Sequence, residues 1–326
     1  MVCQAPSRLE GRSLFLGKLL VSALLLTLLF WRVDRLTFIR TVQAFPLKVF
    51  VGCAMLYILG YLISTFRWQR LLLAEGIRLP LWRLTLVYFQ ASFFNLFLPT
   101  LIGGDIVRGY TIYRITQGHE ASIPSILADR IAGFGALVGI ALIALALAYG
   151  RIRDPQVAVM ILTVAVAFAA TIVVLLHDRM KERASGLLRL VGLTRFQAKL
   201  QGMVEALQRY RGHRRALGQA VLLSVLLQAL IIVTYYLIGA SLNLGVSIVY
   251  FFLYVPLITF VAMLPVSVAG LGVREGGAVY LFAKVGVDAA TALTMSLVWF
   301  SLTLVVSGLG GLAFLLDSHS VQRKHL

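Results

Sequence analysis

The sequence predicts an all-α polytopic membrane protein with six spanning helices, two re-entrant broken-helix hairpins and an inverted-topology repeat. Three observations predict this class: a very apolar composition, apolar blocks of membrane length, and a motif that occurs twice. Of the 326 residues, 60% are hydrophobic and 13% are charged, and the mean hydropathy is +0.91. Soluble domains have roughly 45 to 50% apolar and about 25% charged residues. We therefore expect the chain to fold in lipid.

The basic residues lie between the apolar blocks rather than along one surface. The formal net charge is +17, which in a soluble chain would suggest nucleic acid. Basic residues beside apolar blocks instead set topology and contact lipid headgroups. We expect membrane lipids as partners, either anionic phospholipid or lipid phosphate, and no nucleic acid. Neither the two cysteines nor the five histidines have ligand spacing, so no metal and no cofactor is expected.

Six apolar blocks have the length of about 20 residues that crosses roughly 30 Å of hydrocarbon. These predicted spans cover residues 13–31, 47–66, 131–149, 157–176, 216–238 and 289–316. The first block ends in Phe30, Trp31 and Arg32, with no small-residue cleavage site. We therefore expect it to be retained as a span.

Two further apolar blocks are interrupted by a proline and then by a glycine-rich turn. Proline removes a helical hydrogen bond and glycine weakens a helix, so neither block continues as one straight helix. The predicted hairpins cover about residues 84–127, with a tip at Pro99, and about residues 247–286, with a tip at Pro265. A membrane tolerates such backbone where protein covers it or where it lines a wet cavity.

The longest polar stretch, residues 177–215, sets the predicted orientation. It carries ten basic residues against three acidic ones, which places it in the cytoplasm by the positive-inside rule. Each hairpin must then return to the side from which it enters, and the two enter from opposite faces. The prediction is a multi-pass protein of the cell (inner) membrane with both termini cytoplasmic. An external basic cluster that the rule does not favour is formed by Arg32, Arg35, Arg40 and Lys48.

The pattern Leu-Pro-x4-Gly-x3-Arg occurs twice at identical spacing, from Leu98 to Arg108 and from Leu264 to Arg274. Each copy falls in a broken block, and each block is third in an order of span, span, hairpin, span. We predict two membrane repeats of inverted topology, residues 1–153 and residues 154–326. Transporters with this plan hold their substrate near the midplane, where the repeats meet.

Three motifs together resemble the transmembrane region of the lysylphosphatidylglycerol synthases, a family also called flippase-like. They are Asn95-Leu-Phe-Leu-Pro99-Thr-Leu-Ile-Gly103-Gly104-Asp105-Ile-Val-Arg108, Asp129-Arg130-Ile-Ala-Gly133 and Gly270-Leu-Gly272-Val-Arg274-Glu275-Gly276. The resemblance covers most of the chain. It implies a membrane region that flips a modified lipid, while a separate soluble domain transfers the aminoacyl group. This sequence ends at Leu326, soon after the last predicted span, so we expect no transferase domain.

The candidate site combines broken-helix amides, glycines and charged side chains. Helix N-terminal N–H groups attract phosphate, glycine permits close backbone approach, and arginine binds phosphate through a planar fork. The predicted headgroup-binding residues are Asn95, Gly103, Gly104, Asp105, Arg108, Asp129, Arg130, Gly270, Gly272, Arg274 and Glu275. Two alternatives stay open: the arginines form structural ion pairs with these carboxylates, and Asn95 caps or cross-links helices.

The function that these features favour is a flippase-like transporter that moves an anionic phospholipid or a lipid-linked headgroup between leaflets. The alternative is a membrane enzyme, or an accessory protein, of lipid, aminoacyl-lipid or polyprenyl-phosphate glycan metabolism. No catalytic residue is predicted, because Asp105, Asp129 and Glu275 lack a nucleophile and base pair around them. No ATP-binding loop is present in the sequence, so we expect movement to be passive, ion-coupled or driven by a partner enzyme. A homo-oligomer also stays open.

Overall fold

A computed structural model describes residues 8–97, 103–116, 122–148, 154–176, 212–264 and 266–322, together with positions 204, 208 and 210. Within these ranges every regular element is a helix. The predicted all-α class is confirmed. Both predicted hairpin tips, Pro99 and Pro265, lie outside the described residues, as does nearly all of the basic stretch 177–211.

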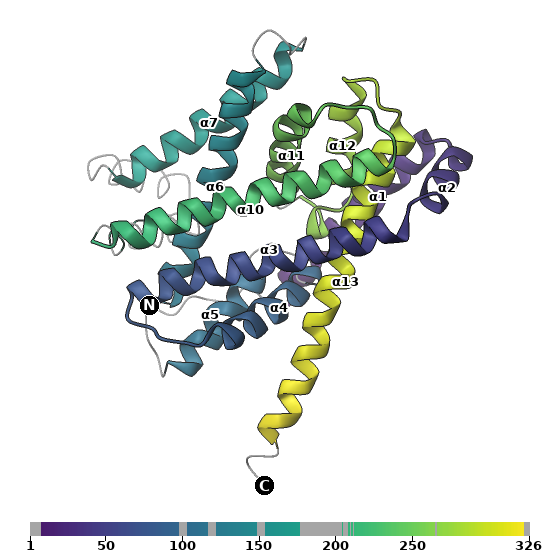
Figure 1. Cartoon of the computed structure of the whole chain (residues 1–326). Coiled ribbons are helices and arrows are strands. Elements are labelled where there is room, and N and C mark those ends of the chain that lie inside the picture. The colour runs from purple at the N-terminus through teal and green to yellow at the C-terminus, as the bar shows by residue number, and fades with distance from the viewer. Residues whose placement is uncertain are drawn as a thin grey trace. The chain divides into compact units, whose positions relative to one another are not determined.

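The helices follow the predicted order of blocks (Figure 1). They are α1 (Arg8–Arg32), α2 (Arg35–Gln43), α3 (Leu47–Ala74), α4 (Leu81–Phe97), α5 (Gly103–Ile115), α6 (Ser122–Leu147), α7 (Pro155–Leu176), α10 (Arg214–Ser241), α11 (Ile248–Ala262), the short 3-10 helix η1 (Val268–Gly270), α12 (Val273–Ala283) and α13 (Ala289–Gln322). By length and composition, α3, α6, α7, α10 and α13 are able to cross a membrane, which makes five spans in the described residues. A sixth is added when α1 and α2, bent by 98°, are counted as one span.

The second predicted span, residues 47–66, lies within a longer helix. α3 continues to Ala74, because its buried face continues past the apolar block and Leu72 is fully buried. The helix ends where Gly76 takes a positive φ of 80° and the Ile77 N–H donates to the Leu72 carbonyl at 3.0 Å. This is the glycine-dependent stop that is common at helix C-termini. A hydrophobicity window locates the apolar block and misses the amphipathic turns beyond it.

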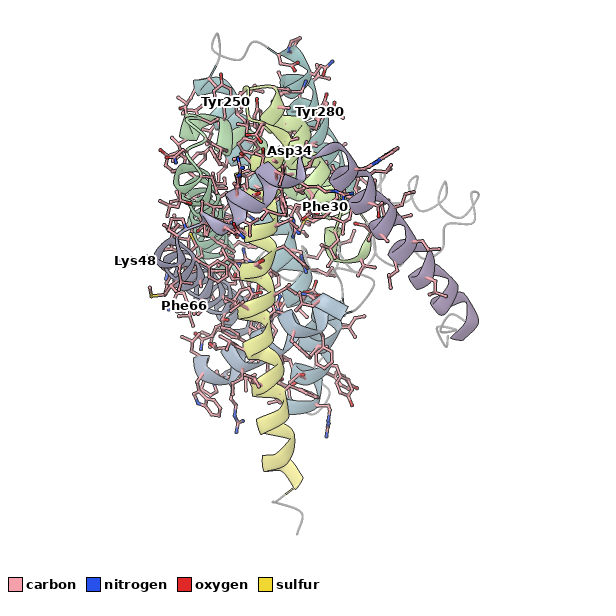
Figure 2. The ribbon with its side chains drawn as sticks, turned by 90° about the vertical axis from the view of Figure 1, so that its right-hand side faces the viewer. Phe30, Asp34, Lys48, Phe66, Tyr250 and Tyr280 are labelled. Atoms are coloured by element: carbon pink, nitrogen blue, oxygen red, sulfur yellow. The ribbon has the colours of Figure 1, made fainter. Side chains whose placement is uncertain are left out.

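The bend between α1 and α2 is built around Asp34, which Figure 2 labels together with Phe30. The Asp34 carboxylate accepts hydrogen bonds from the Leu36 and Thr37 N–H groups, each at 3.2 Å, so it caps α2. The Phe30 and Phe38 rings pack edge to face with centroids 5.4 Å apart across the bend. α2 also packs against α13.

The chain folds into two compact units. Unit 1 contains Met1–Tyr57, Phe89–Asp105 and Val233–Leu326, and unit 2 contains Ile58–Tyr88 and Ile106–Ile232. Each unit takes segments from both predicted repeat halves, so the units are a different division of the chain. The predicted boundary between residues 153 and 154 stays a prediction.

In the first broken block, α5 returns along α4. Ile112 of α5 belongs to the same apolar cluster as Leu84 of α4, and Gly104, eight residues earlier on α5, donates its N–H to Asn95 at 2.7 Å. The earlier residue on α5, Gly104, contacts the later residue on α4, and Ile112 lies near the earlier one. The two helices are therefore antiparallel. A Cβ at Gly104 would lie 2.4 Å from the Ala91 carbonyl oxygen, which explains why this position is glycine.

The second broken block has the same antiparallel arrangement (Figure 1). The Phe251 and Phe282 rings pack at 4.9 Å, and α11 and α12 lie side by side. Nearer the break, a Cβ at Gly270 would lie 3.0 Å from the Ala262 carbonyl oxygen. Gly104 and Gly270 are equivalent positions of the duplicated motif, and each lies against a backbone carbonyl of the preceding helix of its hairpin. The repeated glycine therefore serves hairpin closure.

Two glycines of the last span, Gly310 and Gly311, form a packing face. A Cβ at Gly310 would lie 1.9 Å from the Phe89 carbonyl oxygen of α4, and one at Gly311 would lie 2.6 Å from the Phe93 ring. Small residues let membrane helices approach this closely. α13 thus packs backbone to backbone against the part of α4 that belongs to the same unit.

Candidate functional site

Three charged side chains meet inside unit 2, on α3, α5 and α6. The Arg67 Nε lies 2.6 Å from one Asp129 oxygen, and an Arg108 terminal nitrogen lies 3.2 Å from the other. All three side chains are buried, with exposed fractions of 6% for Arg67, 4% for Arg108 and 2% for Asp129. We call these residues the Arg67–Asp129–Arg108 cluster. The predicted pairing of Arg108 with a carboxylate is present, and the carboxylate is that of Asp129.

Further contacts hold both arginines in place. A terminal nitrogen of Arg67 donates to the Ser224 hydroxyl on α10 at 2.7 Å. The Arg108 guanidinium lies over two aromatic rings, 4.1 Å from the centroid of Trp68 and 4.6 Å from that of Tyr88. Aromatic faces attract cations, more strongly when both are desolvated. The guanidinium of Arg108 is therefore oriented by two rings as well as by Asp129.

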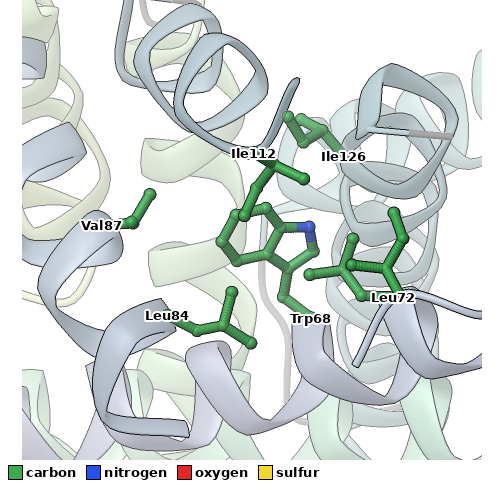
Figure 3. Close-up of a cluster of buried hydrophobic side chains, with 7 residues drawn as sticks. Trp68, Leu72, Leu84, Val87, Ile112 and Ile126 are labelled. Carbon is green, nitrogen blue, oxygen red and sulfur yellow. The ribbon is translucent and has the colours of Figure 1, made fainter. Parts of the chain in front are cut away.

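Trp68 is itself fixed from two directions. Its indole N–H donates to the Ser125 hydroxyl at 3.1 Å, and its ring packs in an apolar cluster with side chains from α3, α4, α5 and α6 (Figure 3). Those that Figure 3 labels are Leu72, Leu84, Val87, Ile112 and Ile126. The first hairpin and α6 therefore hold the ring on which Arg108 rests.

The formal charges of Arg67, Arg108 and Asp129 sum to +1. A charge buried among apolar helices is costly and is retained where it has a partner or a function. Asp129 binds Arg67 at the short end of the range for ionic hydrogen bonds and Arg108 at the long end. Of the two contacts that Asp129 makes in this cluster, the one with Arg108 is the longer.

The second candidate cluster lies in unit 1, at the start of α12. The Glu275 side chain is fully buried. One of its oxygens accepts the Gly272 N–H at 2.7 Å, and the other accepts Arg274 Nε at 2.9 Å and the Ser296 hydroxyl at 3.3 Å. The Arg274 guanidinium also lies 5.0 Å from the Phe300 ring centroid. Glu275 thus occupies the helix N-terminus that the sequence predicts as an anion cradle.

The remaining predicted residues lie close to these two groups in sequence. Gly103 is the first residue of α5 and Asp105 lies in its first turn, while Arg130 follows Asp129 on α6 and is half-buried. The bond from Gly104 shows that Asn95 cross-links the hairpin, as one of the two alternatives expected. A role in headgroup binding stays a prediction for all of these residues.

Sequence reasoning missed the partners that lie on other helices. They are Arg67, Trp68, Tyr88, Ser125 and Ser224 in unit 2 and Ser296 and Phe300 in unit 1. Arg67 carried one usable signal. It directly follows the predicted span 47–66, and the helical period continued from that span places it on the buried face of α3.

The fold and the two buried ion clusters define a polytopic α-helical membrane protein whose charged residues are held between its helices. A family model described as the lysylphosphatidylglycerol synthase TM region matches residues 15–311. The chain belongs to this family. No curated protein and no solved structure is similar enough to the chain to count as a match.

Proposed function

We propose that this protein moves an anionic lipid between the two leaflets of its membrane and that the Arg67–Asp129–Arg108 cluster binds the lipid phosphate. The observation that carries the proposal is the +1 formal charge of three groups buried in unit 2. Membership of a family of lipid-synthase membrane regions is consistent with a lipid-related substrate. A phosphate in contact with Arg108 would complete the charge balance of the cluster.

The planar fork of Arg108 suits this role. Two aromatic rings orient its guanidinium, and arginine offers paired N–H donors that match phosphate oxygens. In the proposed cycle a phosphate takes the place of Asp129 at Arg108, while Asp129 keeps Arg67. The headgroup then leaves when Asp129 recovers both arginines.

Reconstitution of the purified protein in vesicles tests the proposal. Movement of fluorescent phosphatidylglycerol and phosphatidylcholine between leaflets is followed by chemical quenching of the outer leaflet. We expect Arg108→Ala to slow the anionic lipid roughly tenfold to a hundredfold, since a hydrogen bond to a charged group contributes about 1.5–3 kcal/mol. Arg108→Lys restores part of the rate, because it keeps the charge and loses the fork.

The matched control is Arg114→Ala, on the same helix but exposed in its last turn. It should transport like the unchanged protein. Thermal unfolding of each variant in detergent separates loss of transport from loss of fold. Normal stability together with normal transport in Arg108→Ala would remove Arg108 from the site, and the absence of any leaflet exchange in the unchanged protein would leave an accessory or enzymatic function instead.

We also propose that α4 and α5 form a re-entrant hairpin in a cell membrane, with both chain termini in the cytoplasm. The antiparallel pairing of the two helices supports this arrangement. Cysteines placed at Leu81 and Thr116, in a background with Cys3 and Cys53 replaced by serine, should react with an impermeant reagent from the cytoplasmic side only. Labelling of the two positions from opposite sides would make this hairpin a full crossing.

A further inference from the structure

Unit 2 contains a cavity of about 350 Å³ that is separate from the ion cluster. It is lined by one face of α6, by α7, by α10 and by Tyr210. Most of the lining residues on α6 are small, including Ala132 and Gly135, and Phe168 of α7 lies next to Gly135. The small side chains on α6 leave the space that the larger residues of the neighbouring helices do not fill.

The lining of this cavity is apolar. Among the described residues that line it, Tyr210 is the one with a polar side-chain group, and its hydroxyl donates to the Leu71 carbonyl at 3.0 Å. Apolar surroundings of this kind favour hydrocarbon over water.

The cavity begins within one helical turn of the bonds that hold Arg67. On α6, Ala132 follows Asp129 by three residues, and on α10, Val221 precedes Ser224 by three. Residues three apart are neighbours on a helix surface. A buried cationic cluster beside an apolar cavity matches the two chemical parts of a phospholipid. The cluster suits the phosphate, and the cavity suits a hydrocarbon chain.

We infer that this cavity binds an acyl chain of the anionic phospholipid whose phosphate contacts the Arg67–Asp129–Arg108 cluster, an inference that rests on the proposed function. The volume is more than twice the ~150 Å³ of an apolar cavity that takes up benzene, so it has room for a chain of roughly a dozen carbons. A chain leaving the bilayer gains little from burial, because lipid is as apolar as the lining. The cavity therefore acts by shape, aligning the lipid so that its phosphate meets Arg108.

The test is photolabelling with phosphatidylglycerol that carries a diazirine in one acyl chain, on the full chain in vesicles. Mass spectrometry locates the labelled peptides. Gly135→Leu is designed to fill the cavity from α6, because Gly135 lines it and a Cβ there would lie 3.6 Å from the Phe168 ring, an ordinary contact. Val221→Trp fills it from α10 and guards against a folding defect that is particular to position 135.

Each variant has a matched control on the same helix. Gly139→Leu lies one turn beyond Gly135 with open space around its Cβ position, and Leu222→Trp lies beside Val221 on an exposed position outside the lining. We expect the α6 and α10 peptides to be labelled in the unchanged protein and in both controls. Labelling of these peptides should be lost in both filled variants, and transport of the same lipid should slow with it.

The possible outcomes separate this inference from the proposed function. Equal labelling of filled variants and controls would show ordinary annular lipid and overturn the acyl-chain site, and Arg108-dependent transport would then leave the proposed function in place. Loss of labelling in the filled variants without any leaflet exchange in the unchanged protein would support a bound lipid and reject transport. Equal labelling by the diazirine probe of phosphatidylcholine would break the link to the cationic cluster, and with it the inference of an anionic lipid.

Discussion

The two hairpins place an arginine at the same position of a repeated motif, yet the carboxylates beside these arginines are used differently. Asp129 is shared by two arginines. Glu275 binds one arginine, and its other oxygen accepts the Gly272 N–H. The first cluster therefore sums to +1, whereas the formal charges of Arg274 and Glu275 cancel.

This difference assigns different chemistry to two sites that the sequence presents as equivalent. An anion at the first cluster would neutralise it. At the second, an anion would have to displace Glu275 from both Arg274 and the N-terminus of α12, leaving a buried carboxylate without these partners, which is costly. The repeated spacing places a glycine and an arginine alike in both hairpins, while the charge balance favours the first copy as the proposed anion site.

The largest effect that tests this comparison is expected for the carboxylates themselves. Asp129→Asn leaves two buried guanidinium groups without their shared counter-ion and should destabilise the protein by about 3–5 kcal/mol. Glu275→Gln leaves one buried arginine without its counter-ion and keeps a side-chain oxygen for the Gly272 N–H. It should therefore destabilise the protein less than Asp129→Asn does. Thermal unfolding in one detergent compares the two variants directly.

A double variant provides the control for Asp129. Asp129→Asn combined with Arg108→Gln removes one stranded cation and should recover part of the lost stability, with a coupling that reports the contact between the two side chains. Equal melting temperatures for Asp129→Asn and Glu275→Gln would contradict the difference in charge balance. Asp129 and Glu275 would then contribute equally to the stability of the protein.

A smaller effect is expected at the glycines that close the hairpins. A Cβ at Gly104 would meet a backbone carbonyl oxygen at 2.4 Å, so Gly104→Ala should destabilise toward the upper end of the ~1–3 kcal/mol cost of overpacking. Gly270→Ala meets its carbonyl at 3.0 Å and takes a positive φ of 75°, which costs roughly 1–2 kcal/mol for an L-residue. Gly139→Ala, with open space at its Cβ, is the control. If both hairpin variants melt like the control, close approach does not explain the repeated glycine.

Much of the fold follows from local sequence. Apolar blocks of membrane length predicted α3, α6, α7, α10 and α13, and a proline followed by glycines predicted both breaks. Helix ends were less predictable, because α3 is prolonged by buried residues that pack on other segments. A local stretch of the sequence does not contain the distant residues on which these side chains pack.

The candidate site was predictable only in part, because some of its residues also lie on helices that are distant in sequence. Arg274 and Glu275 are adjacent in sequence, so their pairing was an open alternative from the start. Arg67 lies 62 residues from Asp129 and 157 from Ser224, and charge patterning along the chain does not specify which distant helix supplies a partner. The sequence therefore identified which arginines lie in the broken blocks and left the charge balance around each one undetermined.

The smallest effect is expected at Asp34, an exposed carboxylate that caps α2 much as the buried Glu275 caps α12. The Thr37 hydroxyl and then the Thr37 and Leu36 N–H groups stabilise its charged form and hold the pKa of Asp34 below its ordinary value of 3.8. A lowered pKa contributes stability above the ordinary value and loses it as the pH falls through the folded-state value. The start of α2 should therefore exchange its amide hydrogens faster at about pH 3 than at about pH 5, once both rates are corrected for intrinsic exchange.

Asp34→Asn keeps a capping oxygen without the titration, so it should remove this pH dependence and leave α12 unchanged. If the Leu36 and Thr37 amides are equally protected at both pH values in the unchanged protein, the ionised Asp34 carboxylate does not stabilise the start of α2.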